Sequence, residues 1–246
     1  AGFGLAYALA VIITAAAAYD LNVIQVDASN CKIIGIGIEA GFTTVTASQE
    51  VIQLNSTNTT TDIFGTVIEN CYIDMGRAAG AASACDADLD GIRVGLDAND
   101  AAIGTVIRGC TILAYDEDAI SISVGSANCV IDGNIIDDTG ATAGSNGVKI
   151  LATGALVKDN LIITGLSSDT DACINVGVAA AIAHLFNNRL VAWGANTCGV
   201  TVINTATVFS LGNYIGAAAA GNLFDFKTAS TSPSVMGDWG AIYAAD

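Results

Sequence analysis

The sequence predicts an all-β fold, a solenoid of short parallel strands stacked in about seven to eight coils. Two observations indicate this fold. A short motif of apolar and polar residues recurs along the chain, and two separate hydrophobic landmarks repeat with a period of 24 to 28 residues. No amphipathic helical pattern occurs between the repeats. Because one coil cannot bury its inward side chains alone, successive coils must stack to form a core.

The recurring motif is clearest at residues 156–165, where an apolar pair is followed by a polar elbow ending in Asn160, a second apolar run and Gly165. Related segments lie at residues 67–76, 106–112, 129–136, 184–191 and 208–216. Asn at the elbow tolerates a left-handed backbone, and its side chain can hydrogen-bond to the Asn of the next coil. Glycine replaces Asn where the corner needs a positive φ angle without a side chain. The motif therefore predicts one corner of a coil.

The period is the same on both landmarks. The first strand of each coil recurs in steps of 28, 28, 26, 26 and 24 residues, at Ile92, Ile120, Val148, Ile174, Val200 and Phe224. The apolar run after the elbow recurs in steps of 24, 26, 28 and 25 residues, at Ile112, Ile136, Ile162, Leu190 and Ile215. Stacking would place these side chains in columns through the core. The step from Ile52 to Ile92 is 40 residues, so one coil carries an insertion near residues 77–90.

The chain is expected to divide into three segments. Residues 1–20 form an apolar N-terminal cap or interface segment, residues 21–227 the solenoid, and residues 228–246 a capping or interface tail. Residues 1–19 carry no charge, which leaves a membrane anchor or a buried helix as alternatives. The segment is rich in Ala and Gly and lacks a basic flank, so a signal peptide is not predicted and a membrane anchor is disfavoured.

The composition excludes several classes of partner. The 246 residues are 52% hydrophobic and only 13% charged, and the net charge is -16 with 8 Lys and Arg. Nucleic-acid binding needs clustered positive charge, and anionic membranes repel an acidic surface, so neither partner is expected. A surface so poor in charge indicates that other subunits cover much of it, and a homo-oligomer is predicted.

The seven cysteines are an odd number and form no CxxC pair, so neither a zinc site nor a complete disulfide framework is predicted. Cys31, Cys71 and Cys110 each follow Asn or Gly in the repeat. They are expected to stack in one column as small buried apolar residues, because free cysteine behaves as a small hydrophobe. A structural disulfide is the alternative.

One acidic segment fits a cation site. Residues 86–91 read D-x-D-x-D-G, the start of a calcium loop, and Asp97 falls at the twelfth position, where a bidentate acid normally lies. The candidate calcium ligands are therefore Asp86, Asp88, Asp90 and Asp97. The alternative is an acidic surface loop before a strand, since the residues after Gly91 have a strand pattern and the final acid is Asp instead of Glu. No other cofactor is predicted.

The segment Asn160-Leu161-Ile162 and its counterparts, each after a strand of period two, resemble the right-handed parallel β-helix family of pectate-lyase-like proteins over roughly residues 20–230. Within that family, the low charge content of segments such as residues 32–37 looks most like that of virion structural proteins of tailed bacteriophages. The resemblance implies a location in a virus particle, contacts with other virion proteins such as the capsid, and a trimeric spike, fibre or capsid-decorating protein.

Enzymes of this family cleave polysaccharides, and glycoside hydrolysis needs two facing carboxylates. The acidic groups that could supply them are residues 116–118, Asp132 with residues 137–138, and Asp169 with Asp171. All lie at turns, where Asp is frequent for backbone reasons. The motifs of polygalacturonase-like, pectate-lyase-like and pectin-methylesterase-like sites are incomplete, and the single histidine, His184, cannot form a metal site alone. No catalytic residue is therefore predicted.

The leading prediction is a non-enzymatic structural protein of a phage particle that assembles as a homo-oligomer, with a trimer favoured. A tailspike-like protein that binds or degrades carbohydrate is the first alternative. It requires an acidic groove with exposed aromatic side chains, for which the candidates are Tyr115, Trp193 and Tyr214. A self-assembling cell-surface or filament protein is the second alternative.

Overall fold

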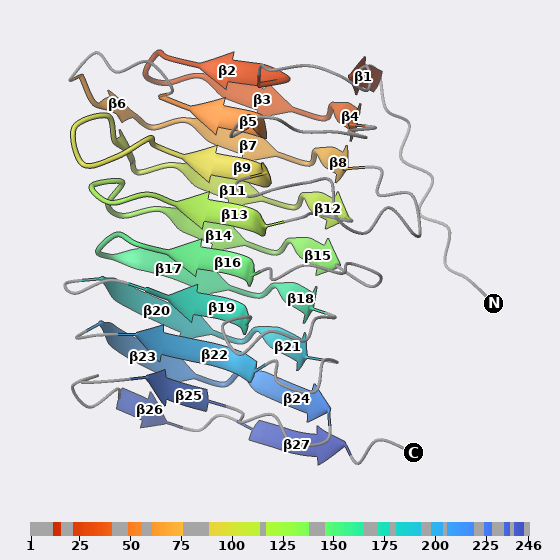
Figure 1. Ribbon diagram of the computed structural model, residues 1–246, viewed down its shortest axis with the longest axis vertical. Helices are drawn as coiled ribbons and strands as arrows, with labels where there is room; N and C mark the ends of the chain where they lie inside the picture. Colours follow the sequence, from red (N-terminus) through yellow and green to blue (C-terminus); the bar gives the residue numbers. More distant parts are fainter. Residues whose placement is uncertain are drawn as a thin grey trace.

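The computed structural model describes residues 12–15, 22–40, 49–55, 61–75, 89–113, 117–137, 146–164, 172–177, 181–192, 198–203, 206–218, 224–227, 234–236 and 239–243. The regular elements in these ranges are β-strands. None of the described residues belongs to a helix that is long and apolar enough to cross a membrane. Figure 1 shows the strands stacked in coils along the longest axis, with β1 at one end and β27 at the other. The predicted all-β parallel solenoid, a β-helix, is confirmed.

Sheet A has nine strands within the described ranges. In spatial order they are β1 (Ile12–Ala15), β4 (Gly37–Ala40), β8 (Tyr72–Asp74), β12 (Thr111–Leu113), β15 (Ile135–Asp137), β18 (Leu161–Thr164), β21 (Arg189–Ala192), β24 (Tyr214–Ala218) and β27 (Trp239–Tyr243). Each strand pairs in parallel with its neighbours. The sheet therefore runs along the whole stack of coils.

Sheets B and C each have eight described strands, also paired in parallel. Sheet B contains β2 (Ile24–Val26), β5 (Gln49–Leu54), β9 (Leu89–Val94), β13 (Asp118–Ile122), β16 (Asn146–Ile150), β19 (Ala172–Val176), β22 (Cys198–Ile203) and β25 (Phe224–Lys227). Sheet C contains β3 (Lys32–Ile34), β7 (Val67–Glu69), β11 (Val106–Arg108), β14 (Val130–Asp132), β17 (Ala155–Lys158), β20 (Ile182–Phe186), β23 (Thr207–Leu211) and β26 (Ser234–Met236). A small additional pair consists of β6 (Ile63–Phe64) and β10 (Ala102–Ile103).

A coil passes from sheet B to sheet C, then to sheet A, and returns to sheet B one level further along the stack. The chain follows this order from β9 through β11 and β12 to β13. The recurring motif thus contains two strands, because residues 156–165 span the end of β17, a corner and β18. Strands this short cannot form a stable pair alone, so pairing with the coils above and below stabilises each one.

Both hydrophobic landmarks form columns in the core. In sheet B, Ile92 pairs with Ile120, Ile120 with Val148, and the register continues to Phe224. In sheet A, Ile112 pairs with Ile136 and the register continues to Ile215. The described side chains of these columns from Ile92 to Val200 and from Ile112 to Ile215 are at most 1% exposed. The period read from the sequence is therefore the register of the solenoid.

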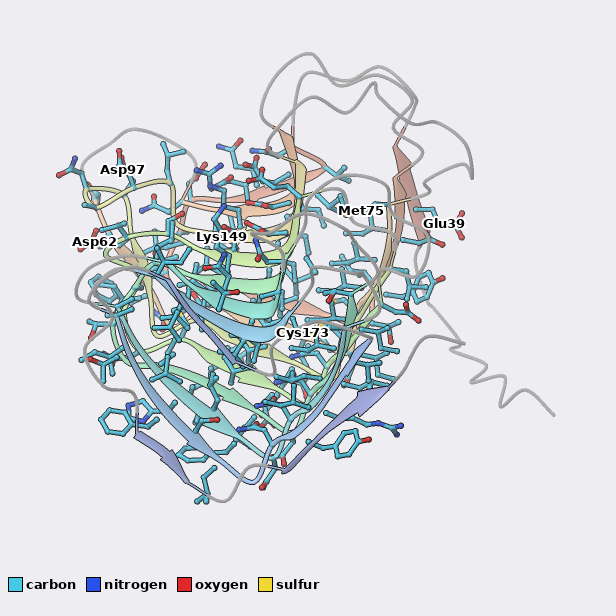
Figure 2. All side chains as sticks on the ribbon, turned by 60° about the horizontal axis from the view of Figure 1, so that its bottom comes forward. Glu39, Asp62, Met75, Asp97, Lys149 and Cys173 are labelled. Carbon is cyan, nitrogen blue, oxygen red and sulfur yellow. The ribbon has the colours of Figure 1, made fainter. Side chains whose placement is uncertain are left out.

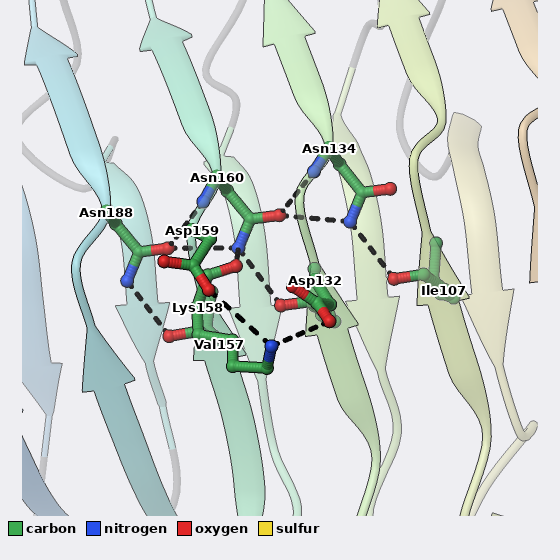
Figure 3. Close-up of polar contacts among 9 residues, drawn as sticks. Ile107, Asp132, Asn134, Val157, Lys158, Asp159, Asn160 and Asn188 are labelled. Carbon is green, nitrogen blue, oxygen red and sulfur yellow. Dashed lines mark hydrogen bonds and ion pairs between the residues drawn. The ribbon is translucent and has the colours of Figure 1, made fainter.

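The corner between sheets C and A carries a ladder of buried asparagines (Figure 3). Asn134, Asn160, Asn188 and Asn213 lie on successive coils. The Oδ1 atom of Asn160 accepts hydrogen bonds from the backbone N–H of Asn134 at 2.9 Å and from its Nδ2 at 3.0 Å. Asn188 accepts the corresponding pair from Asn160, and Asn213 accepts it from Asn188. The predicted bond between corner asparagines of neighbouring coils is confirmed.

The left-handed residue at this corner lies one position before the asparagine that forms the ladder. Positive φ angles occur at Gly109, Gly133, Asp159 and Asn187, whereas Asn160 is not among the left-handed residues of the described chain. The prediction that a single Asn serves both roles was wrong. The corner uses two adjacent residues, one that turns the backbone and one whose amide bonds along the stack.

The same column continues through two cysteines. Thr111 pairs with Tyr72 and with Ile135, which places Cys110 between Cys71 and Asn134 at the corner. Cys31 lies elsewhere, because the pairing of Lys32 with Val67 sets it beside Thr66 between sheets B and C. The prediction of one column for all three cysteines was therefore wrong for Cys31. Among the cysteines whose side chains the structure describes, five are free thiols: Cys31, Cys71, Cys110, Cys129 and Cys173.

Strands of the two terminal segments join the sheets in register. β1 lies within residues 1–20 and pairs with β4, while β26 and β27 lie within residues 228–246 and pair with β23 and β24. The insertion predicted near residues 77–90 falls mostly on residues 76–88, which lie outside the described ranges. The described ladders thus run unbroken from β1 to β27 in sheet A.

Candidate functional site

The strands of sheet B bend, and the bend changes which residues face outward. Two consecutive residues, such as Ala119 and Ile120, are fully buried, so the strict alternation of a flat strand is broken there. Cys173 at the equivalent bend of β19 points inward, where its Sγ lies 3.4 Å from Thr164 Oγ1 of sheet A. Figure 2 shows Cys173 on the inner side of sheet B and Lys149 on the outer side. Residues on either side of the bend therefore both point outward.

Charged side chains gather on this outer face of sheet B, and we call the group the sheet B charge cluster. Its members come from four neighbouring coils: Glu50, Asp90, Arg93, Glu117, Asp118 and Lys149. Arg93 Nη1 lies 2.9 Å from Glu50 Oε1. Lys149 Nζ lies 3.1 Å from Asp118 Oδ2 and 3.2 Å from Glu117 Oε1. Four carboxyl groups thus face two cationic side chains.

Amide side chains extend the cluster along the stack. Asn146 Nδ2 donates to Asp118 Oδ1 at 2.8 Å, and Asn175 Nδ2 donates to Asn146 Oδ1 at 3.2 Å. Although they face outward, these side chains are nearly inaccessible to solvent, since Asp90, Asp118 and Asn175 are at most 5% exposed. Arg93, Glu117 and Lys149 retain between 24% and 29% side-chain exposure and are the accessible part of the cluster.

The acidic groups at the centre favour a bound proton. Burial, followed by the negative charges of Asp118 and Glu117, raises the pKa of Asp90 well above its usual value. Burial also raises the pKa of Asp118, against the opposing effect of Lys149. Burial by itself lowers the pKa of Lys149, but Asp118 and Glu117 outweigh it and raise that pKa. No described group hydrogen-bonds to Asp90 Oδ1. The protonated form of Asp90 is therefore favoured in this buried position.

The four residues of the candidate calcium loop are only partly described. Asp86 and Asp88 lie outside the described ranges. Asp90 belongs to β9 and to the buried cluster, whereas Asp97 lies in an exposed turn beyond the end of that strand. Asp97 Oδ1 accepts hydrogen bonds from the backbone N–H groups of Asn99 at 2.7 Å and Asp100 at 3.2 Å. The calcium site stays a prediction.

The structure places the other acidic candidates on different faces. Glu117 and Asp118 meet at Lys149, but Asp132 lies on sheet C and Asp137 on sheet A. The remaining candidates lie outside the described ranges: Asp116, Asp138, Asp169 and Asp171. Of the residues that the structure describes, no three His, Cys, Asp or Glu are grouped so as to hold a metal ion.

The singled-out aromatic and histidine residues lie away from the cluster. Tyr214 is on sheet A, where the guanidinium carbon of Arg189 lies 6.0 Å from the centre of its ring. His184 is on the outer face of sheet C and stacks on Phe209 with 5.1 Å between ring centroids. Tyr115 and Trp193 lie outside the described ranges.

The sequence analysis did not predict that Asp90 and Asp118, two members of the cluster, lie side by side. Asp90 and Asp118 each precede a landmark isoleucine, Ile92 or Ile120, by two residues, so stacking brings them together. That shared offset was the available signal. Gln53, which the sequence places far from the acidic turns, pairs with Arg93 beside this cluster. Paired carboxyl groups, a glutamine and an arginine therefore meet on one face.

The fold was compared with known proteins. A chain of similar fold is a tailspike protein mutant of E. coli bacteriophage HK620, solved in complex with a hexasaccharide, with a TM-score of 0.56 and 14% identity. The fold resembles that of a phage tailspike. The match covers 87% of this chain but only 37% of that one, so this chain spans well under half of the tailspike's length.

A second similar chain is the Dettilon tailspike protein, at 11% identity and a TM-score of 0.25, with 86% of this chain and 60% of that one covered. No family model and no curated protein sequence matches the chain. At 14% identity the match to the HK620 tailspike shows a similar fold alone.

Proposed function

We propose that this chain is a non-enzymatic structural protein of a phage particle, a spike, fibre or capsid-decorating component that assembles as a homo-oligomer. The observation that carries the proposal is the uninterrupted parallel β-helix, whose coils are joined by three hydrogen-bonded sheets and by the asparagine ladder. Its likeness to the HK620 tailspike supports the same role.

The bonding between coils supports a mechanical role. Every described coil from β5 to β24 bonds to the coils on both sides through its strands. The hydrophobic columns and the amide bonds of the ladder join neighbouring coils, so opening one coil breaks its contacts with the coils on both sides. A rod of this kind resists proteolysis and bending, which suits the outside of a particle. Other virion proteins, such as the capsid, are the proposed attachment partners.

The proposal is tested on particles. Antibodies raised against the recombinant chain would be used for immunogold electron microscopy of purified phage, together with mass spectrometry of the same preparation. We expect regular labelling of one position on the particle and a fixed copy number per particle. Detection on the host cell surface with none in purified particles would overturn the proposal and favour the self-assembling surface protein.

A second function, carbohydrate binding or cleavage, is favoured by the sheet B charge cluster. Glycoside cleavage requires carboxyl groups that reach the scissile bond, and Glu117, with 29% side-chain exposure, is the carboxyl group of the cluster that a bound sugar could contact. The HK620 tailspike was solved with a hexasaccharide bound, which supports a saccharide as the class of ligand. The accessible Arg93 and Lys149 would contact an acidic or polar sugar at the rim.

This second function is tested by glycan binding and by release of reducing ends from bacterial surface polysaccharides. Glu117→Gln is the informative variant because its side chain is partly exposed, and Asp132→Asn on sheet C is the matched control. Loss of binding or cleavage in the first variant alone supports the function. Polysaccharide binding that is equal in both variants, or absent from the native protein across a broad panel, rejects this site.

A further inference from the structure

The outer face of sheet C carries charges in alternating order along the stack. On four successive coils one column reads Glu69, Arg108, Asp132 and Lys158. Arg108 Nη2 lies 2.8 Å from Glu69 Oε2, and Lys158 Nζ lies 2.7 Å from Asp132 Oδ2. The same column begins with Ile34 and ends, within the side chains described, with Phe186 and Leu211.

A second column on this face is mostly apolar. It runs parallel to the first, two residues earlier in each strand, through Lys32, Val67, Val106, Val130, Leu156, His184 and Phe209. Of the five large hydrophobic residues of the described chain that are exposed, three belong to this face: Ile34 at 53%, Phe209 at 39% and Leu211 at 47%. Exposed apolar surface bordered by charge is typical of an interaction site.

We propose that the outer face of sheet C binds the same face of a second copy of this chain, with the two stacks of coils running in opposite directions. The two-fold axis lies parallel to the strands and passes between β11 and β14. This operation preserves the columns and reverses the order of the coils, so each column faces its own copy. The inference goes beyond the proposed function and does not depend on it.

The reversed order makes the charges complementary. Glu69 faces Lys158 of the second copy, and Arg108 faces Asp132. At the ends of the overlap Ile34 faces Phe186. Opposite charges and apolar groups therefore match across the whole charged column, which is the self-complementarity that a two-fold interface requires.

The apolar column matches in the same register. Val67 faces Leu156, and Val106 faces Val130. The end pair, Lys32 opposite His184, is neither apolar nor oppositely charged and does not stabilise this arrangement. Shifting the axis by one strand, to a position between β14 and β17, places Glu69 against Leu211 and Arg108 against Phe186. That register buries charges against apolar side chains and is disfavoured.

Parallel arrangements are less complementary. With coils aligned in the same direction, packing sheet C on sheet A of another copy brings Glu69 to the level of Asp74 and Asp132 to the level of Asp137. Packing sheet C on sheet B in the same way brings Arg108 to Arg93 and Lys158 to Lys149. Like charges at close range oppose both contacts. The two-fold arrangement therefore differs from the trimer that the family resemblance implied.

The contact area sets the expected affinity of the dimer. Six overlapping strands at about 4.8 Å spacing and about 10–17 Å of strand length give a contact of roughly 300–500 Å² on each copy. This is below the roughly 800 Å² per partner of a standard stable interface. A weak dimer that forms with rising concentration is therefore expected from one such contact.

Sedimentation velocity over a concentration series tests the contact. Arg108→Glu places like charges opposite each other at two symmetric positions, and we expect dimerisation to weaken by at least about tenfold. Adding Asp132→Arg restores opposite charges across the interface and is expected to restore the dimer. Arg189→Glu, the same charge change on sheet A, is the matched control and should leave the dimer intact. Equal effects of Arg108→Glu and Arg189→Glu would overturn the proposal.

A photo-crosslink tests whether the two stacks of coils run in opposite directions. With p-benzoylphenylalanine at Leu211, the two-fold arrangement places the probe about one coil from β3 of the second copy. Within one chain β23 and β3 are six strand steps apart, about 29 Å, so an internal crosslink cannot imitate this product. Crosslinked peptides from residues 22–40 support the proposal. Crosslinks confined to residues 181–243, or a monomer at every concentration, overturn it.

Discussion

Removing one amide from the middle of the asparagine ladder tests what stabilises the coils. Asn160 is 2% exposed, and its Nδ2 donates to Asn188 Oδ1 at 2.9 Å and to the backbone carbonyl of Ile131 at 3.0 Å. Its Oδ1 accepts two bonds from Asn134. The variant Asn160→Ala leaves both Asn134 donors without their acceptor and removes one hydrogen bond from the Ile131 carbonyl, in a corner closed to solvent (Figure 3).

The size of the effect follows mainly from the two Asn134 donors. Each buried polar group left without a partner costs about 1–3 kcal/mol. Because the two Asn134 donors share one acceptor and can relax together, the free energy of unfolding is expected to fall by about 3–5 kcal/mol. Lys158→Ala, two residues away and 34% exposed, removes only the surface ion pairs with Asp132 and Asp159 and should cost about 1 kcal/mol or less.

Urea unfolding followed by far-UV circular dichroism and by tyrosine fluorescence measures both variants. Coincident transitions would show that one cooperative unit is being compared in each protein. The slope with denaturant concentration should stay constant, because the surface exposed on unfolding hardly changes. If Asn160→Ala is no less stable than Lys158→Ala, the ladder does not stabilise the stack and the reasoning is refuted.

Three further predictions concern the asparagine ladder and sheet B. Cys110→Asn extends the ladder by one coil, since the thiol already occupies the place of the amide and Cys110 N–H donates to Asn134 Oδ1. We expect the free energy of unfolding in urea to rise by about 1 kcal/mol. A loss of stability would contradict the shared geometry. Asp90→Asn should stabilise the protein at pH 7 by about 1 kcal/mol or more and make stability less dependent on pH. The sign follows because the pKa of Asp90 is raised on folding: the folded state holds the extra proton between the unfolded pKa near 3.8 and the higher folded pKa, so native stability falls as pH rises through that window. Melting temperatures between pH 4 and pH 9 check this, and parallel curves for the two proteins would reject it. Gly147→Ala should cost about 1–3 kcal/mol, because an added Cβ would lie 2.7 Å from the carbonyl oxygen of Cys173; unchanged stability would show that the bend of sheet B can yield.

The outer faces of sheets B and C carry different side chains, and the bend of sheet B contributes to the difference. Sheet B carries buried carboxyl groups, while sheet C carries the alternating exposed charges and apolar side chains. A ligand at sheet B and a second copy at sheet C would not compete for the same surface. The carbohydrate test and the crosslinking test can therefore fail independently.

The sequence alone determined the repeat and the core. Residues of one core column share the same offset in every coil, so Ile92 and Ile120, or Ile136 and Ile162, can be aligned without coordinates. Parallel in-register stacking turns a sequence period directly into a spatial neighbour relation. The corner asparagines followed from the same argument, because an amide can both donate to and accept from its copy one coil away.

The tertiary structure decided which side of each sheet the polar residues occupy. Strict alternation from Ile120 would put Asp118 inside, but the bend at Ala119 turns it outward to meet Lys149. The separation of Cys31 from Cys71 likewise depended on which of two corners each residue occupies. A local pattern cannot supply this information, because outward neighbours are 24 to 43 residues apart and their alignment depends on bends and corner geometry summed over a whole coil.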